Sequence, residues 1–149
     1  MTLNTGTISE ILHHKGTQVW SVNPDATVFD AISLMAEKNV GALLVMQGER
    51  LVGILSERDY TRKVALKGKS SKETAVREIL SGRVIHVPPS HSVDDCMRLM
   101  TEHRTRHLPV MEGDKVLGLV SIGDLVNHVI TAQSQTIQQL QTYITGLPG

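Results

Sequence analysis

Apolar and polar positions along the chain follow an order that occurs twice. Residues 19–22 and 84–87 are short apolar runs that end at proline-containing loops, so each predicts a short strand. Residues 27–39 and 92–104 carry apolar side chains at helical spacing and predict amphipathic helices. The apolar face is expected to hold Val28, Ile32, Met35 and Ala36 in the first helix, and Val93, Met97 and Met100 in the second.

Each predicted helix is followed by two apolar runs with a glycine-containing turn between them. Residues 42–46 and 51–55 flank Gly48 and predict a β-hairpin, which residues 107–111 and 116–120 repeat. A further helix is expected after each hairpin. The order β-α-β-β-α, present twice, predicts an α+β fold. The unbroken apolar character of residues 51–55 and 116–120 predicts strands that are buried on both faces.

The two halves align without a gap at a fixed offset (124 − 59 = 65), and many aligned positions are identical, among them Val22 with Val87 and Pro24 with Pro89. Such small repeats have a marginal core of their own, so we expect them to pack against each other. The predicted organisation is a first repeat at 8–66, a polar linker at 67–75, a second repeat at 76–130 and a C-terminal helical extension at 131–149.

The C-terminal extension continues the last predicted helix. Ile130, Ile137, Leu140 and Ile144 form a narrow apolar seam along it, and Gly146 and Pro148 are expected to end the helix. The seam can pack back on the chain or on a second subunit, and the sequence alone leaves both open.

Composition narrows the class of protein. The chain has 149 residues, and 15 basic against 15 acidic side chains give a formal net charge of zero, which disfavours nucleic acid and acidic membranes as partners. The single Cys96 excludes an internal disulfide, and neither a leader pattern nor a membrane-length apolar run occurs. We expect a soluble, cytoplasmic protein in which any anion site is local.

A hydroxyl residue followed three positions later by Asp occurs four times, at each predicted helix start after a loop or hairpin. The pairs are Thr27 with Asp30, Ser92 with Asp95, Ser56 with Asp59, and Ser121 with Asp124. All four patterns fit a helix N-cap. Only the last two follow a buried strand and a glycine (Gly53 or Gly118), where a helix N-terminus can offer free N–H groups to a phosphate and a carboxylate can bind ribose hydroxyls. These two pairs are therefore candidate ligand sites.

With its two β-α-β-β-α units and twin Gly-x-x-Ser-x-x-Asp motifs, the chain resembles a tandem pair of CBS domains from about Ile8 to Ile130. The resemblance implies two repeats packed through their sheets about a pseudo-twofold axis, with two clefts between them. It also implies that Asp59 and Asp124 hold ribose hydroxyls, and that Ser56 and Ser121 contact phosphate or ribose. The backbone of 15–19 and 82–86, including Lys15, Thr17, Val19 and His86, would frame the adenine.

Positive charge near the second motif is the expected phosphate end of the site. Arg104, Arg106 and His107 lie at the start of a predicted strand, where the first repeat has the uncharged residues Asn39, Gly41 and Ala42. Guanidinium groups bind phosphates bidentately, so Arg106 is the leading candidate, and Arg58, opposite Gly123, is a second. The alternative is that these arginines are solvated surface charges. The asymmetry predicts two sites that are not equivalent.

No other constellation points to catalysis. His103 and His107 flank a predicted helix end, so they do not form a zinc site on one helix face, and no nucleophile with a base or P-loop occurs. We therefore expect no enzyme and no metal.

The leading hypothesis is a regulatory sensor that binds AMP, ADP, ATP or NAD(H), modulates an unknown protein and, by resemblance, forms a homodimer. The alternative is a nucleotide-independent interaction module.

Overall fold

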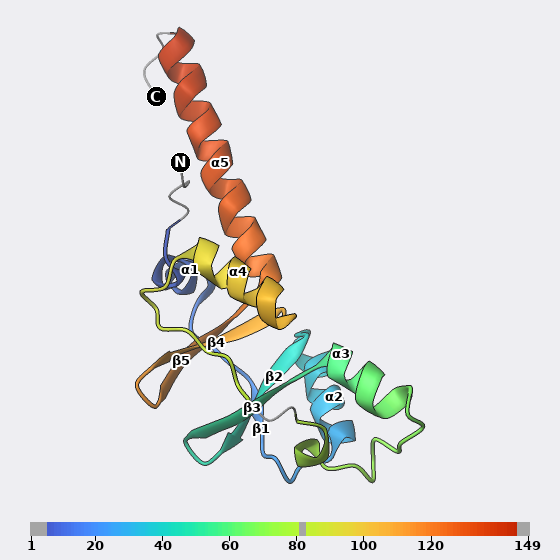
Figure 1. Cartoon of the computed structure of the whole chain (residues 1–149). Helices are drawn as coiled ribbons and strands as arrows, with labels where there is room; N and C mark the ends of the chain where they lie inside the picture. The colour runs from blue at the N-terminus through green and yellow to red at the C-terminus, as the bar shows by residue number, and fades with distance from the viewer. Residues whose placement is uncertain (1–5, 81–82, 146–149) are drawn as a thin grey trace. The chain divides into compact units, whose positions relative to one another are not determined.

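A computed structural model describes residues 6–80 and 83–145, apart from the side chains of 136 and 142–145. Figure 1 shows the whole chain. The chain forms two compact units that are not continuous in sequence. Of the described residues, unit 1 contains 6–17, 87–110 and 118–145, and unit 2 contains 18–80, 83–86 and 111–117. The N-terminal segment thus belongs to the same unit as the second Ser-x-x-Asp motif.

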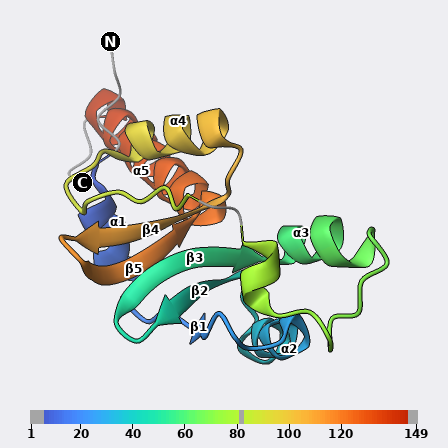
Figure 2. The same cartoon turned by 60° about the horizontal axis from the view of Figure 1, so that its bottom comes forward.

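Unit 2 contains a three-stranded sheet in the order β1 (Ser21–Val22), β2 (Ala42–Gln47), β3 (Arg50–Ser56). β1 is parallel to β2 because helix α2 (Val28–Lys38) forms the crossover between them. β2 and β3 form the predicted antiparallel hairpin, which is seen along its length in Figure 2. The sheet ends at the first Ser-x-x-Asp motif.

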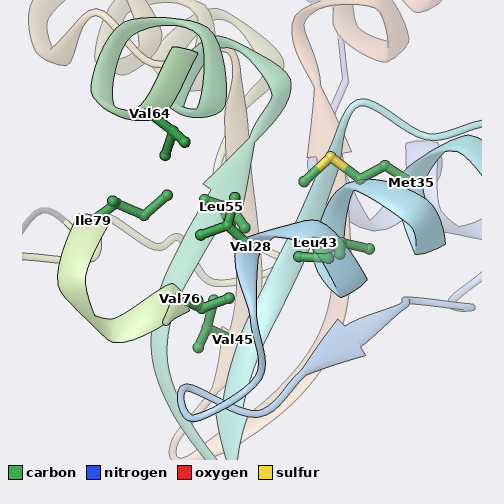
Figure 3. Close-up of a cluster of buried hydrophobic side chains, with 9 residues drawn as sticks. Val28, Met35, Leu43, Val45, Leu55, Val64, Val76 and Ile79 are labelled. Carbon is green, nitrogen blue, oxygen red and sulfur yellow. The ribbon is translucent and has the colours of Figure 1, made fainter. Parts of the chain in front are cut away.

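The core of unit 2 brings together residues that are distant in sequence. Val28 and Met35 of α2 pack with Leu43, Val45 and Leu55 of the sheet. Figure 3 shows two further contributions to this cluster. Val64 comes from a π-helical turn, η1 (Thr61–Ala65), which follows α3 (Glu57–Tyr60), and Val76 and Ile79 come from a short 3₁₀ helix, η2 (Val76–Ile79).

The polar segment before η2 is bound to the start of α2. Thr74 O accepts a hydrogen bond from Val28 N at 2.9 Å, and Ser71 O accepts one from Phe29 N at 2.9 Å. The Lys72 ammonium lies 4.9 Å from the centre of the Phe29 ring. These bonds satisfy backbone donors that a helix start leaves without an intrahelical acceptor.

Unit 1 contains the N-terminal helix α1 (Ile8–Lys15), helix α4 (Val93–His103), the hairpin strands β4 (His107–Glu112) and β5 (Lys115–Ser121), and helix α5 (Ile122–Thr145). The unit boundary assigns the turn end of this hairpin to unit 2. Helix α5 packs on α1 and α4. The buried side chains of unit 1 include Ile8, Ile11, Leu12, Val87, Val93, Cys96, Met100, Leu108, Val110, Val120 and Leu125.

The α+β class, both hairpins and both amphipathic helices are confirmed, but the predicted strand at 84–87 is wrong. Only Val87 pairs there, in one parallel bridge to Val110 that corresponds to the Val22–Val45 pair of unit 2. In unit 2 the ladder continues with the bond from Leu44 N to Trp20 O, at 3.0 Å. The residue equivalent to Leu44 is Pro109, which has no N–H, so the second ladder cannot extend.

Two burial predictions also need correction. The buried face of α2 contains Ala31, whereas Ala36 is exposed. In β3 and β5 full burial alternates with partial exposure, so these strands are not buried on both faces. In α4 Cys96 is completely buried, as predicted for a core residue. Burial, and to a smaller extent the Asp95 carboxylate, raises the pKa of its thiol to about 11. No described helix is both long and apolar enough to span a membrane.

Candidate functional site

The second Ser-x-x-Asp motif closes the junction between β5 and α5. Asp124 Oδ2 accepts a hydrogen bond from Ser121 N at 2.8 Å, and Ser121 Oγ accepts one from Asp124 N at 3.1 Å. The two residues therefore form the reciprocal capping pair that the spacing predicts. Both side chains are half-buried, so the carboxylate keeps a face toward solvent.

Lys15, at the end of α1, reaches the same carboxylate from the other end of the sequence. Its Nζ lies 2.5 Å from Asp124 Oδ2 and 2.7 Å from Leu119 O, to both of which it donates. Burial by itself raises the pKa of Asp124, but the hydrogen bonds from Lys15 and Ser121 and the lysine charge outweigh it, so the net pKa is lowered. Asp124 is therefore ionised at neutral pH, with a cation beside it.

Arg106 is tied to this junction through its backbone. Its carbonyl oxygen accepts a hydrogen bond from Ile122 N, in the first turn of α5, at 2.8 Å. The equivalent bond in unit 2 runs from Glu57 N to Gly41 O at 3.0 Å. The matched bonds show that the residue before the hairpin holds the helix start in both units, and that only unit 1 has a cationic side chain there.

Arg104 lies earlier than predicted, at the C-cap of α4 and not at the strand start. Its φ is 52°, in the left-handed region that favours glycine or asparagine. The equivalent C-cap of α2 is Asn39, with φ 54°. An exposed arginine thus occupies a backbone position for which asparagine is better suited.

The expectation that the motif helices offer free N–H groups to a phosphate is wrong at most of the first positions. In α5 the N–H groups of Ser121, Ile122 and Asp124 already donate to Asp124, Arg106 and Ser121, respectively. The first motif has the same three bonds. These backbone amides are therefore not free to bind a phosphate.

The first motif, in unit 2, has a different cationic neighbour. Asp59 Oδ2 accepts from Ser56 N at 2.9 Å and from Ser56 Oγ at 3.0 Å. Lys63, one helical turn later, has its Nζ 3.7 Å from Asp59 Oδ1 and donates to Ile79 O at 3.0 Å. Sequence reasoning did not select Lys63, although its i,i+4 spacing from Asp59 is a recognisable signal. Thus Asp59 meets a lysine of the adjoining turn η1, whereas Asp124 meets one that is distant in sequence.

The two remaining pairs behave as helix caps. Thr27 Oγ1 accepts from Asp30 N, and Ser92 Oγ accepts from Asp95 N, each at 3.1 Å. The predicted capping role is confirmed for both. Asp95 is instead paired with Arg98 on the helix surface, at 3.4 Å.

The other candidate residues are spread over both units. Thr17 is exposed and follows α1 in unit 1, and His107 opens β4. Val19, half-buried, and the exposed His86 and Arg58 belong to unit 2. Unit 1 therefore brings together Lys15, Ser121, Asp124 and the backbone of Arg106. Among 6–80 and 83–145, no group of three or more His, Cys, Asp or Glu side chains is arranged to hold a metal.

The glycine of each motif has a packing role that the sequence did not reveal. A Cβ on Gly118 would lie 2.7 Å from Leu12 Cδ2, and a Cβ on Gly53 would lie 2.9 Å from Leu80 Cδ2. Leu12 and Leu80 are equivalent residues of the two matched segments at 8–12 and 76–80. Each glycine, three residues before the capping serine, thus leaves room for a leucine side chain.

Comparison with known proteins agrees with the repeated fold. The chain is 41% identical over 150 residues to the mitochondrial CBS domain-containing protein CBSX3 of Arabidopsis thaliana, covering 94% of this chain and 72% of that protein. It is 53% identical to a solved structure of a protein with CBS domains from Burkholderia ambifaria MC40-6, with a TM-score of 0.82 over 86% of this chain and 96% of the other.

A more distant solved structure shares the fold. The CBS domain pair of protein MJ0100, in complex with 5′-methylthioadenosine and S-adenosyl-L-methionine, is 19% identical, with a TM-score of 0.73 over 86% of this chain and 98% of the other. The CBS domain family profile matches twice, at residues 8–66 and 76–131. The chain therefore belongs to the CBS domain family and contains two copies of that domain.

Proposed function

We propose that this chain is a sensor that binds an adenosine-containing ligand at Lys15, Ser121 and Asp124 and thereby changes its affinity for a partner protein. CBS-domain pairs are regulatory modules. The observation that carries the proposal is the ionised, half-buried Asp124 carboxylate at the junction of a strand and a helix. Such a carboxylate is the group that accepts hydrogen bonds from both hydroxyls of a ribose.

The charges around this carboxylate favour an anionic ligand. Lys15 lies on it directly, and Arg106 is held beside the helix start by its own carbonyl. Neither Arg104 nor Arg106 has a carboxylate partner among the ion pairs of the described residues. AMP, ADP, ATP and NAD(H) combine the ribose and phosphate that these groups suit. The MJ0100 structure supports the adenosine part of the proposal.

Lys15 has a double role in this scheme. Ribose hydroxyls and the Lys15 ammonium compete for Asp124, so ligand binding displaces the ion pair. The released ammonium is then available to a phosphate of the same ligand. We therefore expect ATP, ADP and AMP each to bind more tightly than adenosine. Only a phosphorylated ligand offers the Lys15 ammonium a new anionic partner in place of Asp124.

The test is to identify and titrate the ligand. Nucleotides released from purified, heat-denatured protein are identified by mass spectrometry, and the melting temperature is then measured with AMP, ADP, ATP, NADH and adenosine. A ligand at 100 times its Kd should stabilise the fold by about 2.7 kcal/mol. If none of the four nucleotides copurifies and none raises the melting temperature, the sensor proposal is wrong.

A homodimer and a cytoplasmic location remain part of the proposal. The Arabidopsis relative is described as mitochondrial, so location is best examined directly by cell fractionation. The second candidate function is a nucleotide-independent interaction module, and the exposed apolar side chains of α5 favour it. Nucleotide titration separates the two functions, because only the sensor responds.

A further inference from the structure

Helix α5 carries a row of large apolar side chains that are exposed in the described part of unit 1. Val126 is 40% exposed, Ile130 and Ile137 are each 55% exposed, and Leu140 is 56% exposed. These four residues are called the α5 stripe below. The neighbouring Leu125 is completely buried, so a different face of α5 packs against its own unit. In Figure 1 the C-terminal half of α5 runs beyond α1 and α4.

The spacing of the α5 stripe is that of a coiled-coil seam. Val126, Ile130, Gln133, Ile137 and Leu140 follow one another at intervals of four, three, four and three residues. In heptad terms Ile130 and Ile137 occupy a positions, and the other three occupy d positions. β-Branched residues at a with leucine at d favour two parallel strands. The sequence continues this pattern to Ile144, whose side chain lies outside the described part.

Charge argues for an identical partner. From Val129 to the last residue, the sequence contains no Asp, Glu, Lys or Arg and no His. Two copies of this segment can therefore approach each other without charge repulsion. A charged partner, in contrast, would find no opposite charges on this segment to pair with. The segment therefore presents an uncharged, partly apolar surface, and a second copy of the same segment matches it in chemistry.

Gln133 gives the pairing a register. At a d position in a parallel pair it faces Gln133 of the other copy, and each amide can both donate and accept a hydrogen bond. Against an apolar partner the same amide would be buried without a partner, which is costly. A single polar residue in a seam commonly fixes register and the number of strands in this way.

The end of α5 also needs a partner to be helical. Residues 129–145 contain five Gln, which favour a helix, but ten of the seventeen residues are Val, Ile, Thr, Ser or Tyr, whose helix propensity is lower. Isolated helices of such length are marginal in water, so packing must stabilise this one. We propose that the α5 stripe pairs with the same stripe of a second copy as a parallel, in-register coiled coil centred on Gln133.

The proposal rests on the proposed homodimer and is independent of nucleotide binding. It is tested in the full chain by cysteine pairing in a glutathione redox buffer. Gln133→Cys and Leu140→Cys place thiols at d positions, and Gln135→Cys places one at the outer f position as a matched control. The two d-position variants should form the disulfide-linked dimer with at least about tenfold higher effective concentration than the control. The native Cys96 is buried and should not contribute.

Two results would overturn the proposal. Equal cross-linking at 133, 135 and 140 would mean random collision, as expected if α5 packs within its own chain. Efficient linkage between Val126→Cys and Leu140→Cys chains, with little at 140 alone, would mean an antiparallel pair. Ile137→Glu, compared with Gln138→Glu, gives a second readout by sedimentation, where only the former should lower the mass. The melting temperature of the same variants is also measured with and without nucleotide. This measurement tests the sensor proposal separately from the coiled-coil proposal.

Discussion

Leu12 lies directly over Gly118, so close that a Cβ on the glycine would stand 2.7 Å from the leucine Cδ2. The contact joins α1 to β5 within unit 1, and Leu80 and Gly53 repeat it within unit 2. The glycine of the repeated motif is therefore explained by packing in both units. The missing side chain of the glycine leaves room for a leucine. The glycine alone is therefore no evidence of a ligand site.

Gly118→Ala should destabilise the protein by about 1–3 kcal/mol, because the new methyl group overpacks the buried Leu12. The measurement is the free energy of unfolding in urea. The matched control is Gly123→Ala, because a Cβ there meets only Ser121 Oγ at 3.6 Å and the position lies in a helix. The control should be neutral or more stable by up to about 1 kcal/mol.

A double variant tests the cause of that loss. Leu12→Ala removes the side chain that the new methyl group would strike, so Gly118→Ala should cost much less in the Leu12→Ala background. The coupling energy between the two positions is expected to be about 1 kcal/mol or more. Additive effects would show that the loss of stability does not come from a clash with Leu12.

Asp124→Ala should weaken nucleotide binding about 10- to 100-fold, the equivalent of one or two hydrogen bonds to a charged group. Asp95→Ala is the matched control, since both changes leave the hydroxyl cap of the helix in place. Within the described residues the ion pair of Asp95 is with the surface residue Arg98, so its loss should change affinity by no more than about twofold. Isothermal titration with the copurifying nucleotide measures both, and equal losses would place the ligand elsewhere.

Local pattern was sufficient to predict the hairpins, the amphipathic helices and all four caps. These features depend on residues within a few positions of one another, as in Ser121 with Asp124. The prediction made by aligning the two repeats was wrong where a proline stands in place of a residue with a backbone N–H donor. Pro109 stands where Leu44 donates to Trp20, and the strand expected at 84–87 is reduced to a single bridge.

The position of the Lys15 side chain could not be predicted from the sequence pattern. Lys15 was expected to contribute backbone near an adenine, and its ammonium instead meets a carboxylate 109 residues away. That contact exists because α1 belongs to the unit that contains β5, although the repeat places it with β3. No period or motif in a single sequence encodes such an exchange of segments.

The lowered pKa of Asp124 predicts a defined loss of stability in acid. A carboxylate with a folded-state pKa below that of the unfolded chain adds stability above the unfolded value, about 3.9, and loses it as the pH falls through the folded value. The difference in unfolding free energy between the wild type and Asp124→Asn should be constant above about pH 5 and shrink below about pH 4.

Lys15→Met provides the control for this pH dependence. Without the ammonium, the hydrogen bond and the charge by which Lys15 lowers the pKa of Asp124 are lost, while burial and the hydrogen bonds from Ser121 remain. The gap between Lys15→Met and its double variant with Asp124→Asn should therefore be smaller at neutral pH than the gap in the wild type. Urea unfolding from pH 2 to pH 7 measures both, and an unchanged gap would mean that Lys15 does not stabilise the carboxylate.

Arg104→Asn should make the protein more stable and bind nucleotide less well. Arginine at φ 52° pays the steric penalty of the left-handed region, about 1 kcal/mol, which asparagine at the equivalent Asn39 largely avoids. Asn39→Arg is the reciprocal control and should lose a similar amount of stability without gaining affinity. Urea unfolding and nucleotide titration are made on both variants. A stability gain with unchanged affinity would show Arg104 to be a solvated surface charge, whereas a gain accompanied by about tenfold weaker binding would show that the strained position is kept for the phosphate.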